Sequence, residues 1–247
     1  MKILKWILLT LFVLFLIGVI AVFVTSQKRP QGVTSSEADV LAQDMVKALN
    51  YKNYSESKFM TFTFRGAHDY IYYFPSKKLK VSWDNKEVYL LLRTMKGRAY
   101  IDGIEVLGEE KQKLLDKAWE YWCNDSFWVL APFKVFDPGT TRKIVKDADG
   151  KEGLLVEYAT GGTTPGDAYL WYLDENLIPT GWRMWTSILP IKGLYSSWEG
   201  WEKHNDTWYS TKHKMLINLE ITNFGIYRNW KTMGYKTHPL HPLTNFK

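Results

Sequence analysis

The chain has 247 residues, of which 46% are hydrophobic and 16% aromatic, and its formal net charge is +6. This charge is modest and dispersed along the chain, which argues against a nucleic-acid-binding surface. The single cysteine, Cys123, excludes an internal disulfide, and we interpret it as a buried structural thiol.

The first element in the chain is a long apolar run. Residues 6–24 (WILLTLFVLFLIGVIAVFV) carry no charge, and Lys2 and Lys5 precede them. As a helix this run would span roughly 28 Å, close to the ~30 Å core of a bilayer. The sequence therefore predicts a single-pass transmembrane anchor over residues 1–27, with the following domain in the periplasm. A cleaved signal peptide is the alternative, although its apolar region usually has only ~7–15 residues.

A polar tether over residues 28–36 precedes a predicted amphipathic helix. We expect Ser36 to cap this helix, which runs from Glu37 to about Asn50. Its apolar residues recur at helical spacing, as expected for a helix that packs on a sheet: Ala38, Leu41, Ala42, Met45 and Leu49.

Short β-rich runs follow, separated by turn residues. In Lys58–Arg65 large apolar residues alternate with threonines, the period-two pattern of a half-buried strand. Four similar runs continue the series, and together they indicate an antiparallel meander: His68–Phe74, Leu79–Trp83, Glu87–Arg93 and Arg98–Ile101.

A second helix is predicted over Glu109–Cys123, where Leu114, Leu115, Ala118, Trp119 and Trp122 share a face. We expect Asn124 to end it, because asparagine tolerates the left-handed conformation. The aromatic stretch of residues 125–138 contains two prolines, and we expect it to pack irregularly into or over the sheet.

The second half of the chain is again rich in strands. Gly153–Thr160 and Ala168–Asp174 flank Thr164-Pro165-Gly166-Asp167, which fits a type II turn and predicts a hairpin. Further strands are expected, and the tail after Trp230 is expected to be irregular: Gly181–Ile188, Leu194–Trp201, Thr207–Lys214 and Met215–Asn223.

This order of elements predicts a mainly β (α+β) fold. One strongly curved antiparallel sheet of about 10–12 strands, an unclosed β-barrel covered by the two helices, accounts for residues 37–247. The predicted transmembrane helix precedes this single domain.

The helix-to-meander passage ADVLAQDMVKALN into KFMTFTF resembles the LolA-like group of lipoprotein carriers and related lipid-binding proteins. Two further blocks, at Tyr121–Thr140 and Gly153–Glu175, resemble an uncharacterised family of bacterial, mainly Bacteroidota-type, envelope proteins that is thought to share this fold. The resemblance implies an unclosed barrel and an envelope location. It implies no reaction, and an anchored chain would depart from the soluble carriers.

Motifs of several enzyme classes are absent from the sequence. It contains no Gly-x-Ser-x-Gly and no phosphate-binding glycine loop, and its five histidines do not converge on a metal-binding pattern. Asn124-Asp125-Ser126 looks like a polar cluster, but we interpret it as a helix stop. We therefore expect no cofactor, no metal and no catalytic residue.

The remaining candidate site is the apolar concavity of the sheet. Its predicted lining consists of Phe62, Phe64, Tyr70, Tyr72, Leu115, Trp119, Trp122 and Trp128. The function that we predict is non-enzymatic binding of a lipid, an acyl chain or a lipidated partner by a membrane-anchored domain. Two alternatives remain: an interaction module of an envelope complex that binds no small ligand, and a hydrolase of envelope lipids or glycans.

Overall fold

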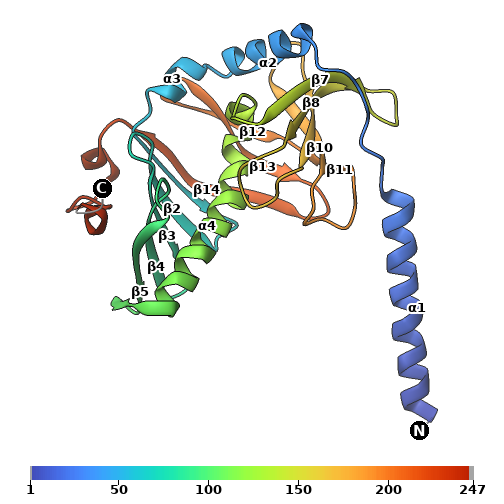
Figure 1. Ribbon diagram of the computed structural model, residues 1–247, viewed down its shortest axis with the longest axis horizontal. Coiled ribbons are helices and arrows are strands. Elements are labelled where there is room, and N and C mark those ends of the chain that lie inside the picture. Colours follow the sequence, from blue (N-terminus) through green and yellow to red (C-terminus); the bar gives the residue numbers. More distant parts are fainter. Residues whose placement is uncertain (1, 245–247) are drawn as a thin grey trace.

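A computed structural model describes residues 2–244 of the chain, with the backbone alone described at residues 2–3 and 15–23. Its strands form two antiparallel sheets, and helix α4 (Gly108–Leu130) lies between them (Figure 1). The nine-stranded sheet contains, in spatial order, β12 (Glu199–His204), β13 (Thr207–Lys214), β14 (Asn218–Tyr227), β1 (Phe59–Phe64), β2 (His68–Tyr73), β3 (Lys78–Trp83), β4 (Lys86–Leu91), β5 (Lys96–Ile101) and β6 (Ile104–Val106). The five-stranded sheet contains β11 (Leu194–Ser197), β10 (Pro179–Trp185), β9 (Ala168–Leu173), β8 (Glu152–Tyr158) and β7 (Thr140–Lys146).

The prediction of one curved sheet is wrong, because the strands belong to two sheets. The run expected as a single strand, Leu194–Trp201, is divided at Trp198 into β11, which pairs with β10, and β12, which pairs with β13. The Trp198 side chain is buried in the core at this point. Alternation along a strand does not reveal such a change of partner. Strand β7 was also not predicted.

Hairpin β8–β9 agrees with the prediction. The two strands pair in antiparallel register from Leu154 with Trp171 to Glu157 with Ala168. Within the loop that joins them, Gly166 has a φ of 98°, and the Asp167 N–H donates to the Thr164 carbonyl at 3.4 Å. Both features are those of a type II turn.

The helices differ from the prediction mainly at their ends. Helix α2 (Ser36–Ala48) is capped by Ser35 rather than Ser36, since the Ser35 hydroxyl accepts the Ala38 N–H at 3.2 Å. Helix α4 does not stop at Asn124 but continues to Leu130, and the short helix η1 (Ala131–Lys134) follows it. The remaining helical segments are α3 (Tyr51–Ser55), η2 (Trp230–Met233) and η3 (His241–Leu243).

The predicted transmembrane anchor is not supported. Helix α1 runs over Lys2–Thr25, but its side chains are described only at residues 4–14 and 24–25, so residues 15–23 of the predicted run lie outside the described side chains. The stretch of residues 4–14 would span roughly 16 Å, about half of a bilayer core. Among the residues described, no helix has both the length and the apolar character needed to cross a membrane. The predictions of a single-pass membrane location and of a periplasmic position for the domain depended on this anchor, so they are not supported either.

The main hydrophobic core lies between the sheets, around α4. The outer face of each sheet is covered as well. Gln27 and Gly32, which precede α2, pack on the five-stranded sheet, where the Trp185 indole N–H donates to the Gln27 carbonyl at 2.8 Å. The segment after Tyr227 packs on the nine-stranded sheet, where Leu240 and Leu243 complete a cluster with three strand residues, Phe59, Ile71 and Tyr89.

Candidate functional site

A cavity of about 630 Å³ lies between the two sheets, along α4. Its walls come from α4, from β1 and β2 of the larger sheet, and from β8, β9 and β10 of the smaller sheet. Aromatic and aliphatic side chains predominate, including four tryptophans: Trp119, Trp122, Trp128 and Trp182. A largely apolar, concave space with a few polar groups is the usual form of a small-molecule site.

The structure separates the eight predicted lining residues into two groups. Five of them line the cavity, namely Phe64, Tyr72, Trp119, Trp122 and Trp128. The other three fill the core and do not border it: Phe62 is 1% exposed, and Tyr70 and Leu115 are each 2% exposed. Phe62 and Tyr70 stack on each other with ring centroids 4.4 Å apart, and their rings lie 6.4 and 5.9 Å from that of Trp122 on α4.

The prediction missed the wall formed by the five-stranded sheet. Tyr158, Tyr169, Trp182 and Met184 contribute to this wall. Phe127 packs α4 against this wall, since its ring lies 4.9 Å from that of Tyr169 and 5.8 Å from that of Trp182. The period-two pattern of these strands was visible in the sequence. It does not show, however, which of the two faces looks toward the helix.

Two loops carry exposed apolar side chains at one end of the cavity. Ile188 in the β10–β11 loop is 62% exposed, and Ile217 in the β13–β14 loop is 47% exposed. Both residues line the cavity, together with Leu189 and Met215 from the same loops. The apolar lining is therefore continuous with the molecular surface at this end.

A buried polar cluster holds the middle of α4 on the nine-stranded sheet. The Asp125 residue is 1% exposed, and its carboxylate accepts hydrogen bonds from His68 Nδ1 and from the Tyr70 hydroxyl, both at 2.6 Å. Burial, followed by the nearby Asp125 carboxylate, raises the pKa of Tyr70 well above its usual value, so the phenol remains a donor. Asp125 does not border the cavity, whereas its neighbours Asn124 and Ser126 do. The predicted helix stop is thus an internal turn of α4, stabilised by tertiary hydrogen bonds.

The polar groups of the cavity wall show no reactive arrangement. Burial raises the pKa of the Cys123 thiol to about 12, which makes it a poor nucleophile. The Ser126 hydroxyl donates to the Trp122 carbonyl at 2.6 Å within α4. The buried hydroxyls of Tyr158 and Thr186 have no hydrogen-bond partner among the described residues. In the same part of the chain, no three His, Cys, Asp or Glu side chains converge as metal ligands would.

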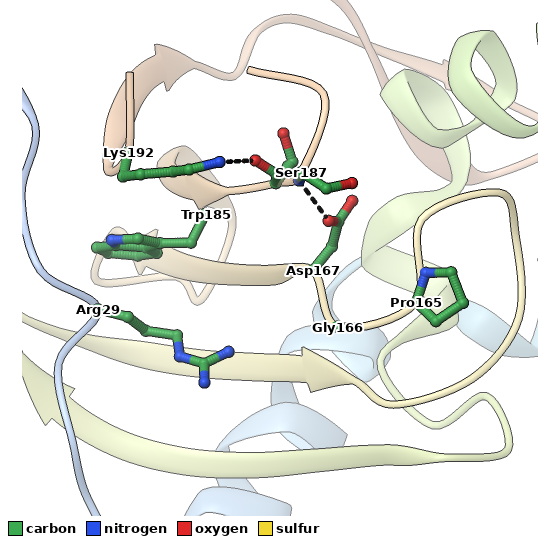
Figure 2. Close-up of a pocket in the computed structure, with 8 residues that line it drawn as sticks. Arg29, Pro165, Gly166, Asp167, Trp185, Ser187 and Lys192 are labelled. Atoms are coloured by element: carbon green, nitrogen blue, oxygen red, sulfur yellow. Dashed lines mark hydrogen bonds between the residues drawn. The ribbon is translucent and has the colours of Figure 1, made fainter. Parts of the chain in front are cut away.

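A second, smaller cavity of about 320 Å³ lies where the N-terminal segment meets the five-stranded sheet. In Figure 2 the side chains of Lys192 and Arg29 lie on either side of Trp185, with Asp167 nearby. The Lys192 ammonium donates to the carbonyls of Thr186 and Leu189, and Arg29 pairs with Glu157 at 3.5 Å. Because its charged groups already have partners within the protein, we interpret this recess as part of the docking of the N-terminal segment.

Comparisons with protein-family models, with curated proteins and with solved structures find no match to this chain. The resemblance to LolA-like and Bacteroidota-type envelope proteins therefore stays a prediction. The function has to be argued from the cavity itself.

Proposed function

We propose that this protein binds a hydrophobic small molecule, such as a lipid or an acyl chain, in the 630 Å³ cavity between its sheets. The single observation that supports this most is the size and lining of the cavity. Its volume falls in the range of about 300–1,000 Å³ that is typical of small-molecule sites. Each methylene group transferred from water into such a lining contributes ~0.8 kcal/mol to binding.

The arrangement of the aromatic residues supports binding over a filled core. In the main core, tryptophan and phenylalanine rings fill the space, as Trp171 does at 0% exposure. Trp119 and Trp122, one helical turn apart on α4, instead border open volume. The open end with Ile188 and Ile217 provides a route by which an apolar ligand can enter.

Native mass spectrometry tests the proposal directly. The purified protein is measured before and after delipidation, and then after incubation with a long-chain fatty acid. We expect one fatty acid bound per chain, and we expect the delipidated protein to regain it. A protein that carries no ligand and takes up none would contradict the proposal and favour an interaction module without a small ligand.

A pair of tryptophan variants connects binding to this cavity. Trp119→Ala removes a ring from the cavity wall, while Trp230→Ala removes one from the segment that covers the outer face of the nine-stranded sheet. We expect the Trp119→Ala variant alone to bind a fluorescent fatty acid less tightly. Equal affinities in the two variants would place the ligand elsewhere.

A further inference from the structure

The lining of the cavity includes residues from the turns at both ends of β2. It reaches Arg65, in the turn before this strand, and Lys77, in the turn after it. These turns are separated by the six residues of β2, which extend over roughly 20 Å at ~3.3 Å per residue. Aromatic side chains such as Phe64, Tyr72 and Trp122 occupy the intervening wall. The space therefore suits a long apolar tail with its ends near the two turns.

The charged side chains that line the cavity differ in whether they have a partner that offsets their charge. Lys134 and Asp137 form an ion pair at 2.5 Å, so their charges offset each other. The Asp167 carboxylate accepts hydrogen bonds from the Thr164 hydroxyl at 2.6 Å and from the Ser187 N–H at 3.0 Å. Arg65 and Lys77, in contrast, have no carboxylate within ion-pair distance among the described residues. Two unpaired cations thus stand at opposite ends of an apolar space.

Arg65 lies at the end of the cavity that is continuous with the surface. Its backbone N–H donates to the Glu220 carbonyl at 3.0 Å, which places it beside Leu219 and the β13–β14 loop that carries Ile217. The Glu220 carboxylate is 3.5 Å from the Lys212 ammonium. The Arg65 guanidinium is therefore a cation next to an apolar opening, where a ligand can lie with its tail inside and its head outside.

We propose that the ligand is an anionic amphiphile, and that Arg65 binds its carboxylate or phosphate head while the tail fills the cavity along α4. This inference rests on the proposed function and specifies the chemical class of the ligand. Arginine suits the role better than lysine, because its planar fork donates two parallel hydrogen bonds to a carboxylate or phosphate. Lys77, at the opposite end, belongs to the cavity lining with Tyr54 and Leu92, where the end of the tail would lie.

The test compares ligands that share one tail and differ in the head. The full-length protein is titrated with a fluorescent fatty acid, with its methyl ester and with the corresponding alkyl phosphate. The matched variants are Arg65→Asn and Lys77→Asn, both at positions of positive φ, 51° and 52°, where asparagine is tolerated. Arg65→Lys, which keeps the charge, is the rescue variant, and thermal unfolding verifies that each variant is folded.

We expect the wild-type protein to bind the acid and the phosphate more tightly than the ester. Arg65→Asn should weaken binding of both anions by roughly three- to tenfold, as for a half-solvated ion pair, and leave the ester unchanged. Lys77→Asn should behave as wild type, and Arg65→Lys should retain most of the preference for anions. The ratio between acid and phosphate then shows which head is preferred.

Three results would overturn the inference. Equal affinity of the wild-type protein for acid and ester would show that the anionic head does not contribute to binding. The proposal of a hydrophobic site would be unaffected. Loss of the anion preference in Lys77→Asn, but not in Arg65→Asn, would show that the head binds at Lys77, at the end of the cavity opposite to the one proposed. Binding of none of the three ligands would refute the proposed function, and this inference with it.

Discussion

Among the described residues, Asp125 is the most deeply buried acidic residue. A carboxylate that is 1% exposed must be compensated by hydrogen bonds, and His68 and Tyr70 provide them. A carboxylate can only accept, so His68 Nδ1 carries the proton of the hydrogen bond between the two side chains. The three side chains hold α4, and with it one wall of the cavity, on strand β2.

The first prediction concerns this cluster. Asp125→Ala should lower the free energy of unfolding by about 3 kcal/mol, because it leaves two buried donors without their acceptor. Asp116→Ala is the control on the same helix, where the carboxylate is exposed and accepts a hydrogen bond from Gln112 at 2.8 Å. It should cost less than ~0.5 kcal/mol. Urea denaturation measures both, and similar losses would show that the cluster does not stabilise α4.

A second residue, His213, makes stability depend on pH. Its ring is 1% exposed, lies between Trp128 and Trp198 at 5.1 and 4.6 Å, and accordingly has its pKa lowered by burial to about 4. In the unfolded chain His213 binds a proton near pH 6.5, whereas the buried ring of the folded protein binds one only near pH 4. The contribution of His213 to the free energy of unfolding is therefore full above pH 6.5, and it decreases as the pH falls toward 4.

The second prediction follows from the direction of this pH dependence. Between pH 6.5 and 5 the wild-type protein should lose about 2 kcal/mol of stability through His213. His213→Asn cannot titrate, so its free energy of unfolding should fall less over the same interval. Chemical denaturation at several pH values measures this difference. Parallel curves for the two proteins would mean that His213 is protonated equally in the folded and unfolded states.

At the scale of elements, helix α4 shows where local sequence signals were sufficient and where they failed. The apolar spacing of Leu115, Ala118 and Trp122 correctly predicted a helix whose face is buried. Asn124 and the polar residues after it resemble a helix end, but the helix continues, with Asp125 in tertiary hydrogen bonds and Trp128, Val129 and Leu130 buried in the core. Five of the eight predicted cavity residues border the cavity, because helical spacing and strand alternation give the correct faces.

The strands show the same limit of prediction from local sequence signals. Most were predicted with nearly correct bounds, since alternation and turn residues are local properties. Their partners are not local, and the division at Trp198 transfers one continuous run from one sheet to the other. The wall that contains Trp182 and Met184 was missed for this reason. A sequence pattern cannot show against which sheet an apolar face is packed.

At the scale of the whole molecule, two segments near the ends of the chain cover the outer faces of the sheets: the stretch with Gln27 and Gly32, and the segment after Tyr227. The tail after Trp230 was expected to be irregular, and up to residue 244, where the described part ends, its helical segments are short turns. Nevertheless Leu240 and Leu243 are fully buried against Phe59 and Ile71. Lys78 fixes this segment further by donating to the Leu243 carbonyl at 2.9 Å.

The third prediction tests this cover. Leu243→Ala should cost ~2–5 kcal/mol of unfolding free energy, the usual loss for a buried leucine. Leu216→Ala, at a position that is 73% exposed, should stay within ~0.5 kcal/mol of wild type. Thermal unfolding compares the two variants. If Leu243→Ala proved as harmless as its control, the C-terminal segment would not be a stable part of the fold.

The central claim, that an apolar ligand lies in the cavity between the sheets, is tested most directly by tryptophan fluorescence. Four tryptophans line the cavity, and bromine quenches an indole only on close approach. A fatty acid brominated along its tail should quench the delipidated protein saturably, with one ligand per chain, and unbrominated fatty acid should reverse the effect by competition. Quenching that never saturates, or fluorescence that does not change while the protein stays folded, would contradict the claim.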